Sequence, residues 1–387
     1  MNPRVRAALA AAARPVCAYV YDRATLATRA RALRAALPAG SGLYYAVKAN
    51  SHPAVLAALA PHVDGFDVAS TGELAKVRGF GGQVVYGGPG KTDAALRAAL
   101  DTADLIAVES PHELRRLCRL CRLCRLAERD ARVLLRVNRP GGDLAGSHRM
   151  AGTPTQFGLD PELLDEVAAL AAPPVRLVGF HLHEVSNNLD AAAHAHFVAE
   201  GLDWSVAAAR RAGINLAVVD VGGGLGLDYT GGQGGPFDLD AFAAGLAGLA
   251  VPAGVRLLFE PGRWLAGPAG WYATEVLDLK RTHGAWFAVV RGGTHHFRLP
   301  AAWGYSHPFT VLPVDGWPYP WPRPEVRDTA VTVAGELCTP RDVLARDTPV
   351  ARLRVGDVLV FGDAGAYGWD ISHHDFLSHP HPQMLVI

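Results

Sequence analysis

Short apolar runs alternate with Ala- and Leu-rich helical patterns from about Thr25 to Ala266, with helices predicted at 53–60, 72–79 and 191–212. Alternation of this kind indicates parallel strands joined by helical crossovers. Eight such units predict a closed (β/α)8 barrel, an α/β fold, over residues 25–266. The predicted strands are 43–47, 65–68, 84–86, 105–108, 133–137, 177–182, 216–221 and 256–259.

The pattern changes after about residue 267. Strand-like runs recur at 271–277, 286–290, 329–333 and 358–361, and long helical patterns disappear. Proline and aromatic residues are dense over 303–324. These features predict a separate C-terminal β domain over 267–387. The alternating segment 17–21 is expected to join its sheet, so that residues 1–24 contribute a strand.

Composition narrows the class of protein. Half of the 387 residues are hydrophobic and 19% are charged, which is typical of a globular chain. Lys plus Arg equals Asp plus Glu at 37 each, so no basic excess indicates a nucleic-acid or membrane partner. No apolar run approaches the roughly 18 residues of a transmembrane helix. Arginines interrupt the start of the chain, which favours an amphipathic first helix over a signal peptide.

The five cysteines do not form a disulfide framework, and we expect a reducing, cytoplasmic location. Three of them, Cys118, Cys121 and Cys124, lie in a tandem Arg-Leu-Cys repeat. An iron–sulfur or zinc site is one interpretation, but positions three apart drift around a helix and no fourth ligand is near. A helix without a metal is the preferred interpretation.

Four histidines near the end also resemble metal ligands. Two prolines interrupt any regular ligand spacing there, and no acidic cluster accompanies them. We therefore predict no resident metal. The histidines are His373, His374, His379 and His381.

Lys48 directly follows the apolar stretch Tyr44-Tyr45-Ala46-Val47. At the carboxyl end of a barrel strand it would project into the mouth, where barrel active sites lie. A desolvated amine in that position can lose its proton and attack a carbonyl. Taken alone, the position is better explained by a lysine that simply reaches solvent from a strand end.

Glycine-bearing turns follow the last two predicted barrel strands. They read Asp220-Val221-Gly222-Gly223-Gly224 and Glu260-Pro261-Gly262-Arg263. Glycines let backbone N–H groups approach an anion, and late βα loops are favoured phosphate sites. Each could also be an ordinary tight turn. Glu260 could hold a proton on a pyridine nitrogen, or could form a salt bridge with Arg263.

His181 and His183 lie two residues apart on a predicted strand, so both imidazoles should face one side. Metal binding is possible, but the sequence offers no carboxylate or third histidine to complete a clear set. Stacking of a flat imidazole on a cofactor ring is the competing interpretation.

Together these motifs resemble the fold-type III pyridoxal 5′-phosphate (PLP) decarboxylases that act on ornithine, arginine and diaminopimelate. The resemblance runs from Tyr19 to Phe376 and is carried by six motifs in the family's order. They are Tyr45-Ala46-Val47-Lys48-Ala49-Asn50 with Phe66-Asp67-Val68-Ala69-Ser70-Thr71-Gly72-Glu73, His183 with Ser186, Asp220 with the triple glycine, Glu260 to Arg263, Cys338 with Asp342, and Asp363-Ala364-Gly365-Ala366-Tyr367.

The resemblance implies an alanine-racemase-like fold, in which a PLP-binding barrel precedes a C-terminal β domain. It implies that Lys48 carries PLP covalently, His183 stacks on the pyridine ring and Glu260 pairs with the ring nitrogen. Cys338 would come from the partner subunit of a homodimer and act near Cα, so that each site is built from both chains. The implied phosphate ligands are Ser186, Gly223, Gly224, Gly262, Arg263 and Tyr367.

The chain departs from the family where the substrate's distal end would bind. Thr339 stands at a position where the lysine, arginine and ornithine branches place an acidic residue for the distal amine. A buried ammonium without that partner would be costly, and Arg341 adds a cation instead. Arg298 stands where the diaminopimelate branch places a carboxylate-binding arginine, and the His295-His296 pair adds donors. Arg298, Thr339, Arg341 and Asp342 form the predicted substrate-binding set.

These variants look like the decarboxylases of carboxylate-siderophore pathways, whose substrates are diaminopropionate or serine units attached to citrate. We therefore expect a PLP-dependent carboxy-lyase that acts on such a small-molecule conjugate. One alternative is a diaminopimelate or basic amino-acid decarboxylase, in which Glu184 or Asp342 would bind the distal amine. A racemase on the same fold is a second alternative, and a non-catalytic PLP-binding homologue is a third.

Overall fold

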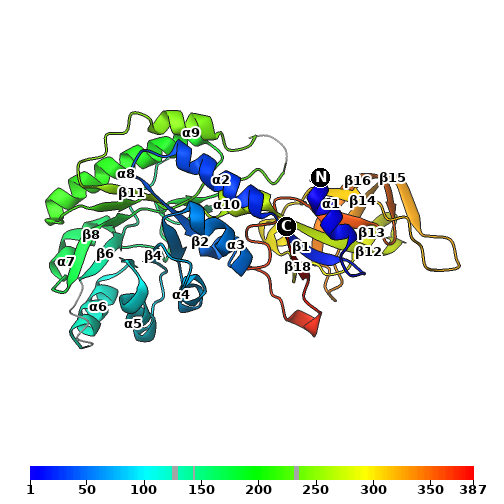
Figure 1. Ribbon diagram of the computed structural model, residues 1–387, viewed down its shortest axis with the longest axis horizontal. Coiled ribbons are helices and arrows are strands. Elements are labelled where there is room, and N and C mark those ends of the chain that lie inside the picture. The colour runs from blue at the N-terminus through cyan, green and yellow to red at the C-terminus, as the bar shows by residue number, and fades with distance from the viewer. Residues whose placement is uncertain (124–129, 143, 231–234) are drawn as a thin grey trace. The chain divides into compact units, whose positions relative to one another are not determined.

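The computed structural model describes residues 1–123, 130–142, 144–230 and 235–387 (Figure 1). The chain divides into two compact units. The β unit comprises Met1–Leu26, Asp228–Gln233 and Ala266–Ile387, and the barrel unit comprises Ala27–Leu227 and Gly234–Leu265. Among the described residues, the structure has no helix that is both long and apolar enough to cross a membrane.

The barrel unit contains a closed barrel of eight parallel strands, which confirms the predicted fold class (Figure 1). One buried cluster inside it unites Tyr44, Val85, Leu134 and Leu258, which come from different strands. Around the barrel the strands follow one another in chain order. They are β2 (Gly42–Ala46), β3 (Gly65–Val68), β4 (Gln83–Tyr86), β5 (Leu105–Val108), β6 (Ala131–Arg136), β8 (Val175–His181), β10 (Val218–Asp220) and β11 (Arg256–Phe259).

Helices surround the strands, and local sequence fixes where several of them begin (Figure 1). At α4, Ser70 Oγ accepts from the Glu73 N–H at 3.1 Å, and Glu73 Oε2 accepts from the Ala69 N–H at 2.7 Å. This reciprocal capping satisfies two N–H groups that a helix start leaves unpaired. The helices are α2 (Arg23–Ala36), α3 (Pro53–Leu59), α4 (Thr71–Val77), α5 (Asp93–Thr102), α6 (Pro111–Leu123), α7 (Leu164–Ala169), α8 (Ala191–Ala212), α9 (Leu239–Leu246) and α10 (Arg263–Ala266).

The Arg-Leu-Cys repeat falls on α6. Cys118 and Cys121 are buried on this helix, where they pack as small apolar side chains. Cys124, the third cysteine of the repeat, lies outside the described residues.

The β unit is built on an eight-stranded sheet. The N-terminal strand β1 pairs antiparallel with β12, with Tyr19 opposite Tyr272, and pairs parallel with β18. The short first helix, α1 (Pro3–Ala10), packs Val5 and Leu9 into the core of this unit. The strands are β1 (Cys17–Tyr21), β12 (Gly270–Thr282), β13 (Ala285–Val290), β14 (Phe309–Leu312), β15 (Glu325–Ala334), β16 (Val343–Arg354), β17 (Val358–Phe361) and β18 (Gln383–Val386).

Sequence patterning missed the long strand β16. Arginines, Asp347 and Pro349 interrupt its apolar positions, so no strand-like run is visible. It forms because it pairs along most of its length with β15, from Val343 opposite Ala334 to Arg354 opposite Glu325. Tertiary pairing outweighs local propensity here.

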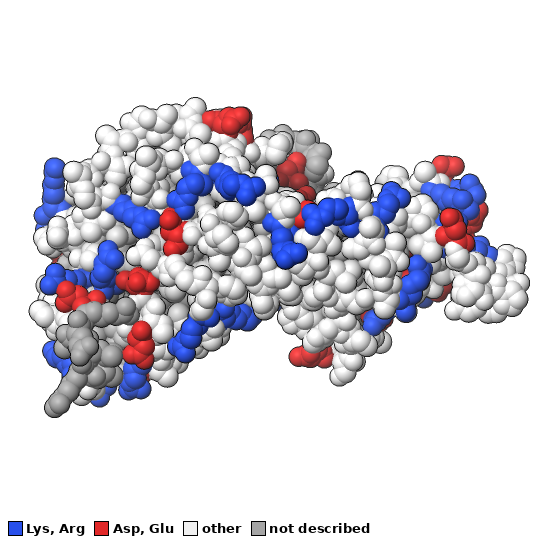
Figure 2. Space-filling model, viewed as in Figure 1, with Lys and Arg blue, Asp and Glu red and all other residues white. Residues whose placement is uncertain are grey.

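Charges of both signs are interspersed on the face of the molecule drawn in Figure 2. This distribution agrees with the balanced composition of 37 basic and 37 acidic residues.

Candidate active site

Several functional candidates follow the carboxyl ends of the barrel strands. Lys48 lies in a one-turn 3-10 helix, Val47–Ala49, directly after β2. His181 and Asp220 are the last residues of β8 and β10, and Glu260 follows β11. Parallel strands bring these positions to one end of the barrel, which is where barrel enzymes place their catalytic groups.

Lys48 forms an ion pair with a carboxylate from the neighbouring strand. Its Nζ lies 2.8 Å from Oδ2 of Asp67 on β3, and Asp67 is buried. Burial, followed by the nearby Glu260 carboxylate, raises the pKa of Asp67, while Lys48 opposes this shift. The pair therefore fixes the position of the lysine amine. Sequence analysis included Asp67 in a family motif but did not predict that it pairs with Lys48. An acidic residue inside a short apolar strand could have indicated such a pairing, because a buried carboxylate needs a partner.

Glu260 belongs to a buried group of three. His181 Nε2 lies 3.5 Å from Glu260 Oε2. An imidazole nitrogen of His181 and a carboxylate oxygen from each of Asp220 and Glu260 all lie within 4.8 Å of one another. Burial by itself would raise the pKa of Glu260, but His181, Lys48 and Asp220 together lower it below its ordinary value. Burial and Glu260 raise the pKa of Asp220 well above its ordinary value. Glu260 is thus the charged member of an acid–carboxylate pair.

This group corrects one expectation. The sequence offered no carboxylate to complete a set with His181, whereas the fold supplies two from later strands. Residue types of this kind could hold a metal. Here they surround the carboxylate expected to meet the PLP nitrogen, so we interpret His181 and Asp220 as support for Glu260.

His183 lies beyond the end of β8, close to the glycine-rich turn after β10. Its Nδ1 accepts a hydrogen bond from the Gly223 N–H at 3.3 Å. Burial, together with the charges of Lys48 and Arg136, lowers the pKa of His183 well below its ordinary value. The ring is therefore neutral and carries its hydrogen on Nε2. A flat, neutral imidazole suits stacking on an aromatic cofactor.

The barrel residues fit PLP on two observations. The Glu260 side chain is buried at the carboxyl end of the barrel and is kept charged by its surroundings, so it can accept a hydrogen bond from a protonated ring nitrogen. The glycines also have no room for side chains: a Cβ on Gly223 would lie 2.4 Å from the Glu260 carbonyl oxygen, and one on Gly262 would lie 2.7 Å from Ala49 Cβ. This tight packing holds the turns after β10 and β11 side by side, which a phosphate site built from backbone N–H groups of both turns requires.

Two further predicted phosphate ligands lie near these turns. Arg263 is buried at the start of α10, and Ser186 lies on β9 (Val185–Ser186), which pairs with β7 (His148–Arg149). The remaining predicted ligand, Tyr367, belongs to the β unit, where it has a positive φ of 53° in the turn after β17.

Cys338 is exposed on the loop between β15 and β16 of the β unit. Asp342 shapes this loop from beneath: its Oδ2 accepts from the Leu337 N–H at 2.8 Å, and its Oδ1 accepts from the Thr294 N–H at 2.6 Å. Asp342 is 1% exposed, so its carboxylate is used within the loop rather than presented to a ligand. Its position indicates support of Cys338 and Thr339.

The structure brings three predicted substrate residues together. Arg298, Thr339 and Arg341 line one cavity of about 700 Å³ within the β unit. No Asp or Glu is among the described residues that line it. A cavity with this lining favours an anionic ligand.

The His295-His296 pair does not contribute donors to that cavity, contrary to the sequence expectation. Both side chains are fully buried in the β unit. Burial is the main cause that lowers the pKa of His295 to about 4 and that of His296 to about 2, so both are neutral at pH 7. His296 Nδ1 instead lies 3.4 Å from the thiol of Cys17.

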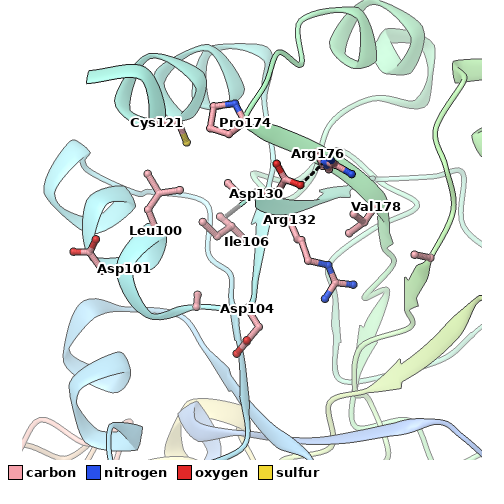
Figure 3. Close-up of a pocket in the computed structure, with 13 residues that line it drawn as sticks. Leu100, Asp101, Asp104, Ile106, Cys121, Asp130, Arg132, Pro174, Arg176 and Val178 are labelled. Atoms are coloured by element: carbon pink, nitrogen blue, oxygen red, sulfur yellow. Dashed lines mark ion pairs between the residues drawn. The ribbon is translucent and has the colours of Figure 1, made fainter. Parts of the chain in front are cut away.

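A larger cavity, of about 880 Å³, lies at the other end of the barrel (Figure 3). Ile106, Arg132 and Arg176 line it from the amino-terminal parts of β5, β6 and β8, and Arg176 pairs with Asp130 at 2.5 Å. Its size does not make it the reaction site, because the amino-terminal end of a barrel is generally the structural end.

Comparison with known proteins agrees with this geometry. Residues 23–267 match the family model described as pyridoxal-dependent decarboxylase, pyridoxal binding domain. A 2-[(L-alanin-3-ylcarbamoyl)methyl]-2-hydroxybutanedioate decarboxylase of Staphylococcus aureus is 41% identical over 98% of this chain and 96% of its own length. An L-glutamyl-acyl-carrier-protein decarboxylase of Niallia circulans is 30% identical over 94% of this chain and 87% of its own.

A solved structure shows the same fold. Diaminopimelate decarboxylase from Helicobacter pylori, complexed with L-lysine, superimposes with a TM-score of 0.84 at 24% identity, over 97% of this chain and 92% of its own. The family model covers the barrel with its lysine and glycine turns, and the relatives extend the similarity over the β unit. The chain therefore belongs to the family of pyridoxal-dependent decarboxylases.

Proposed function

We propose that this enzyme decarboxylates an L-amino acid whose side chain is joined to citrate, as a step of carboxylate-siderophore assembly. A 2,3-diaminopropionate unit is the first choice for the amino acid, and serine is the second. The observation that carries the proposal is the cavity beside Cys338, lined by Arg298, Thr339 and Arg341 without a carboxylate among its described lining residues. The name of the Staphylococcus aureus relative describes such a substrate, an L-alanine whose C3 is linked through an amide to a citrate skeleton.

A free diamino acid as substrate would require a carboxylate for its distal ammonium. Glu184 is 2% exposed and pairs with Arg149 at 2.9 Å. Asp342 accepts two backbone N–H groups of its own loop. Both candidates are therefore already occupied, and an ammonium entering the arginine-lined cavity would meet like charge.

The proposed mechanism divides the work among the residues of the chain. PLP, when bound, supplies the electron sink for cleavage of the bond between Cα and its carboxylate. Lys48 would hold the cofactor covalently through its amine, which Asp67 fixes in position. Glu260, kept charged beside His181 and Asp220, holds the proton at the pyridine nitrogen. His183 covers the ring, and Cys338 delivers the proton near Cα.

Substrate preference tests the proposal. We expect citryl-diaminopropionate, and then citryl-serine, to give a specificity constant at least ~10²-fold above those of lysine, ornithine and meso-diaminopimelate, because paired charges are lost with the wrong ligand. The measurement is CO2 release across this panel with the PLP-loaded enzyme. A simple diamino acid with the highest specificity constant would replace the citrate proposal with an ordinary basic amino-acid decarboxylase.

The same panel of compounds distinguishes a decarboxylase from a racemase and from a non-catalytic homologue. A racemase would invert the Cα centre and release no CO2. A non-catalytic homologue would bind PLP, as seen by absorbance and borohydride trapping, and would turn over none of the compounds.

We also propose a cytoplasmic homodimer in which each site uses Cys338 of the partner subunit. The exposed Cys338 on a loop of the β unit supports this arrangement, since a shared site needs such a projecting thiol. Cys17, Cys118 and Cys338 lie outside any disulfide bond, which suits a reducing compartment.

Hybrid dimers test the shared site. A mixture of Lys48→Ala and Cys338→Ala proteins should regain activity, because a hybrid has one site with both residues intact. Random exchange of equal amounts should restore roughly a quarter of wild-type activity, since half of the dimers are hybrids with one working site of two. Differently tagged subunits, purified in sequence, isolate the hybrid for assay. Hybrids that form but stay inactive would contradict a site built from both chains.

A further inference from the structure

The cavity beside Cys338 contains a third arginine, which the sequence patterns do not single out. Arg346, on β16, lines it together with Arg298 and Arg341. Its volume of about 700 Å³ lies within the range of roughly 300–1,000 Å³ typical of small-molecule sites. The cavity lies entirely within the β unit.

The charges of these arginines are not balanced by the protein. None of the three guanidinium groups has an ion pair or hydrogen bond with the described residues, and no Asp or Glu lines the described part of the cavity. Elsewhere on the same strand, Arg352 pairs with Glu325 at 2.8 Å and Arg354 with Asp357 at 2.9 Å. Three like charges around one cavity repel one another, and an anionic ligand would remove that cost.

The backbone holds Arg346 in place at the wall of the cavity. Ser306 Oγ accepts from the Arg346 N–H at 2.8 Å and donates to the Arg346 carbonyl at 3.4 Å. Ser306 belongs to the loop that precedes β14. The next residue of this loop, His307, donates its N–H to the Leu344 carbonyl at 3.1 Å. The loop and β16 therefore form one fixed wall, and a guanidinium on such a wall is suited to two-point pairing with a carboxylate.

We propose that this cavity is a polycarboxylate-binding site, in which Arg298, Arg341 and Arg346 pair with the two carboxylates left free on the substrate's citryl group, or with the three of free citrate. The site rests on the proposed function, because it holds the citrate end of the substrate while the adjacent Cys338 acts at the amino-acid end. The proposal goes beyond the proposed function because it assigns Arg346 as a residue that determines substrate specificity. It also implies that free citrate binds the enzyme and competes with the substrate.

Titration of the PLP-loaded enzyme with citrate, followed by calorimetry, tests the site. Wild-type protein should bind citrate, and Arg346→Gln should bind it at least ~10-fold more weakly, since one charge-assisted pair is lost. The citrate affinity of Arg346→Lys should lie between those of the wild type and Arg346→Gln. An ammonium keeps the positive charge but cannot form the two parallel hydrogen bonds of a planar guanidinium. Arg352→Gln is the matched control on the same strand and should bind citrate as the wild type does. Cofactor absorbance and thermal melting should be the same in all four proteins.

Kinetics give the second readout. Citrate should inhibit turnover of citryl-diaminopropionate competitively, and Arg346→Gln should raise KM with little change in kcat. The inference is overturned if the wild-type protein binds no citrate or if Arg346→Gln binds citrate with wild-type affinity. It is also overturned if Arg352→Gln lowers the citrate affinity as much as Arg346→Gln does. These outcomes leave the proposed function standing when citryl-diaminopropionate remains the best substrate. Preference for a free diamino acid would overturn the proposed function whatever the citrate titration shows.

Discussion

Replacement of Lys48 by alanine is expected to lower turnover by ~10³-fold or more, the scale on which loss of a covalent catalytic residue acts. It should also remove the absorbance band of the lysine-bound cofactor. The reason is chemical: Lys48 supplies the amine that we propose bonds PLP, and Asp67 Oδ2, 2.8 Å from Lys48 Nζ, holds that amine in place. The measurements are CO2 release and the absorption spectrum of protein reconstituted with PLP.

Two further variants separate the covalent role of Lys48 from its charge. Lys48→Arg keeps a cation for Asp67 but supplies no amine of the same reactivity, so the band should still be lost while the protein stays folded. Lys280→Ala removes an exposed lysine on β12 and should leave both band and turnover unchanged. An undiminished band in Lys48→Ala would show that another group binds the cofactor.

Replacement of Glu260 by glutamine is expected to leave PLP bound and to slow decarboxylation by ~10²–10³-fold, as removal of one preorganised charge commonly does. The environment of Glu260 keeps its pKa below the ordinary value, so the side chain is a carboxylate over the working pH range. A neutral amide cannot stabilise a proton on the ring nitrogen to the same extent. Single-turnover CO2 release, with cofactor occupancy followed by absorbance, measures the effect.

The control for Glu260 is Glu166→Gln on the exposed surface of α7, which makes the same chemical change away from the barrel mouth. It should retain wild-type turnover. If Glu260→Gln also turned over at the wild-type rate, Glu260 would be a structural residue that holds His181 and Asp220 in the barrel.

The order of elements in the barrel could be predicted from the sequence alone. Each barrel strand is a short apolar run and each crossover has a helical pattern, so local periodicity and repetition were sufficient for the closed barrel. Motifs confined to one loop were equally visible: Lys48 after β2, the triple glycine after β10 and the turn from Glu260 to Arg263. Their catalytic roles remain predictions. In the β unit, where β16 carries charges and a proline, patterning was insufficient because strand pairing with β15 determines the structure.

The tertiary structure alone decided which groups meet. Asp67, His181 and Asp220 come from three strands, and only closure of the barrel brings them around Lys48 and Glu260. Arg346 lies on a strand that the pattern did not reveal, yet folding places it in one cavity with Arg298 and Arg341. Asp342 and the His295-His296 pair were expected from the sequence to bind the substrate, but the folded chain buries them away from direct contact with a ligand. Sequence periodicity reports short-range order, whereas contacts between distant strands, and the burial that sets their pKa values, exist only once the chain has folded.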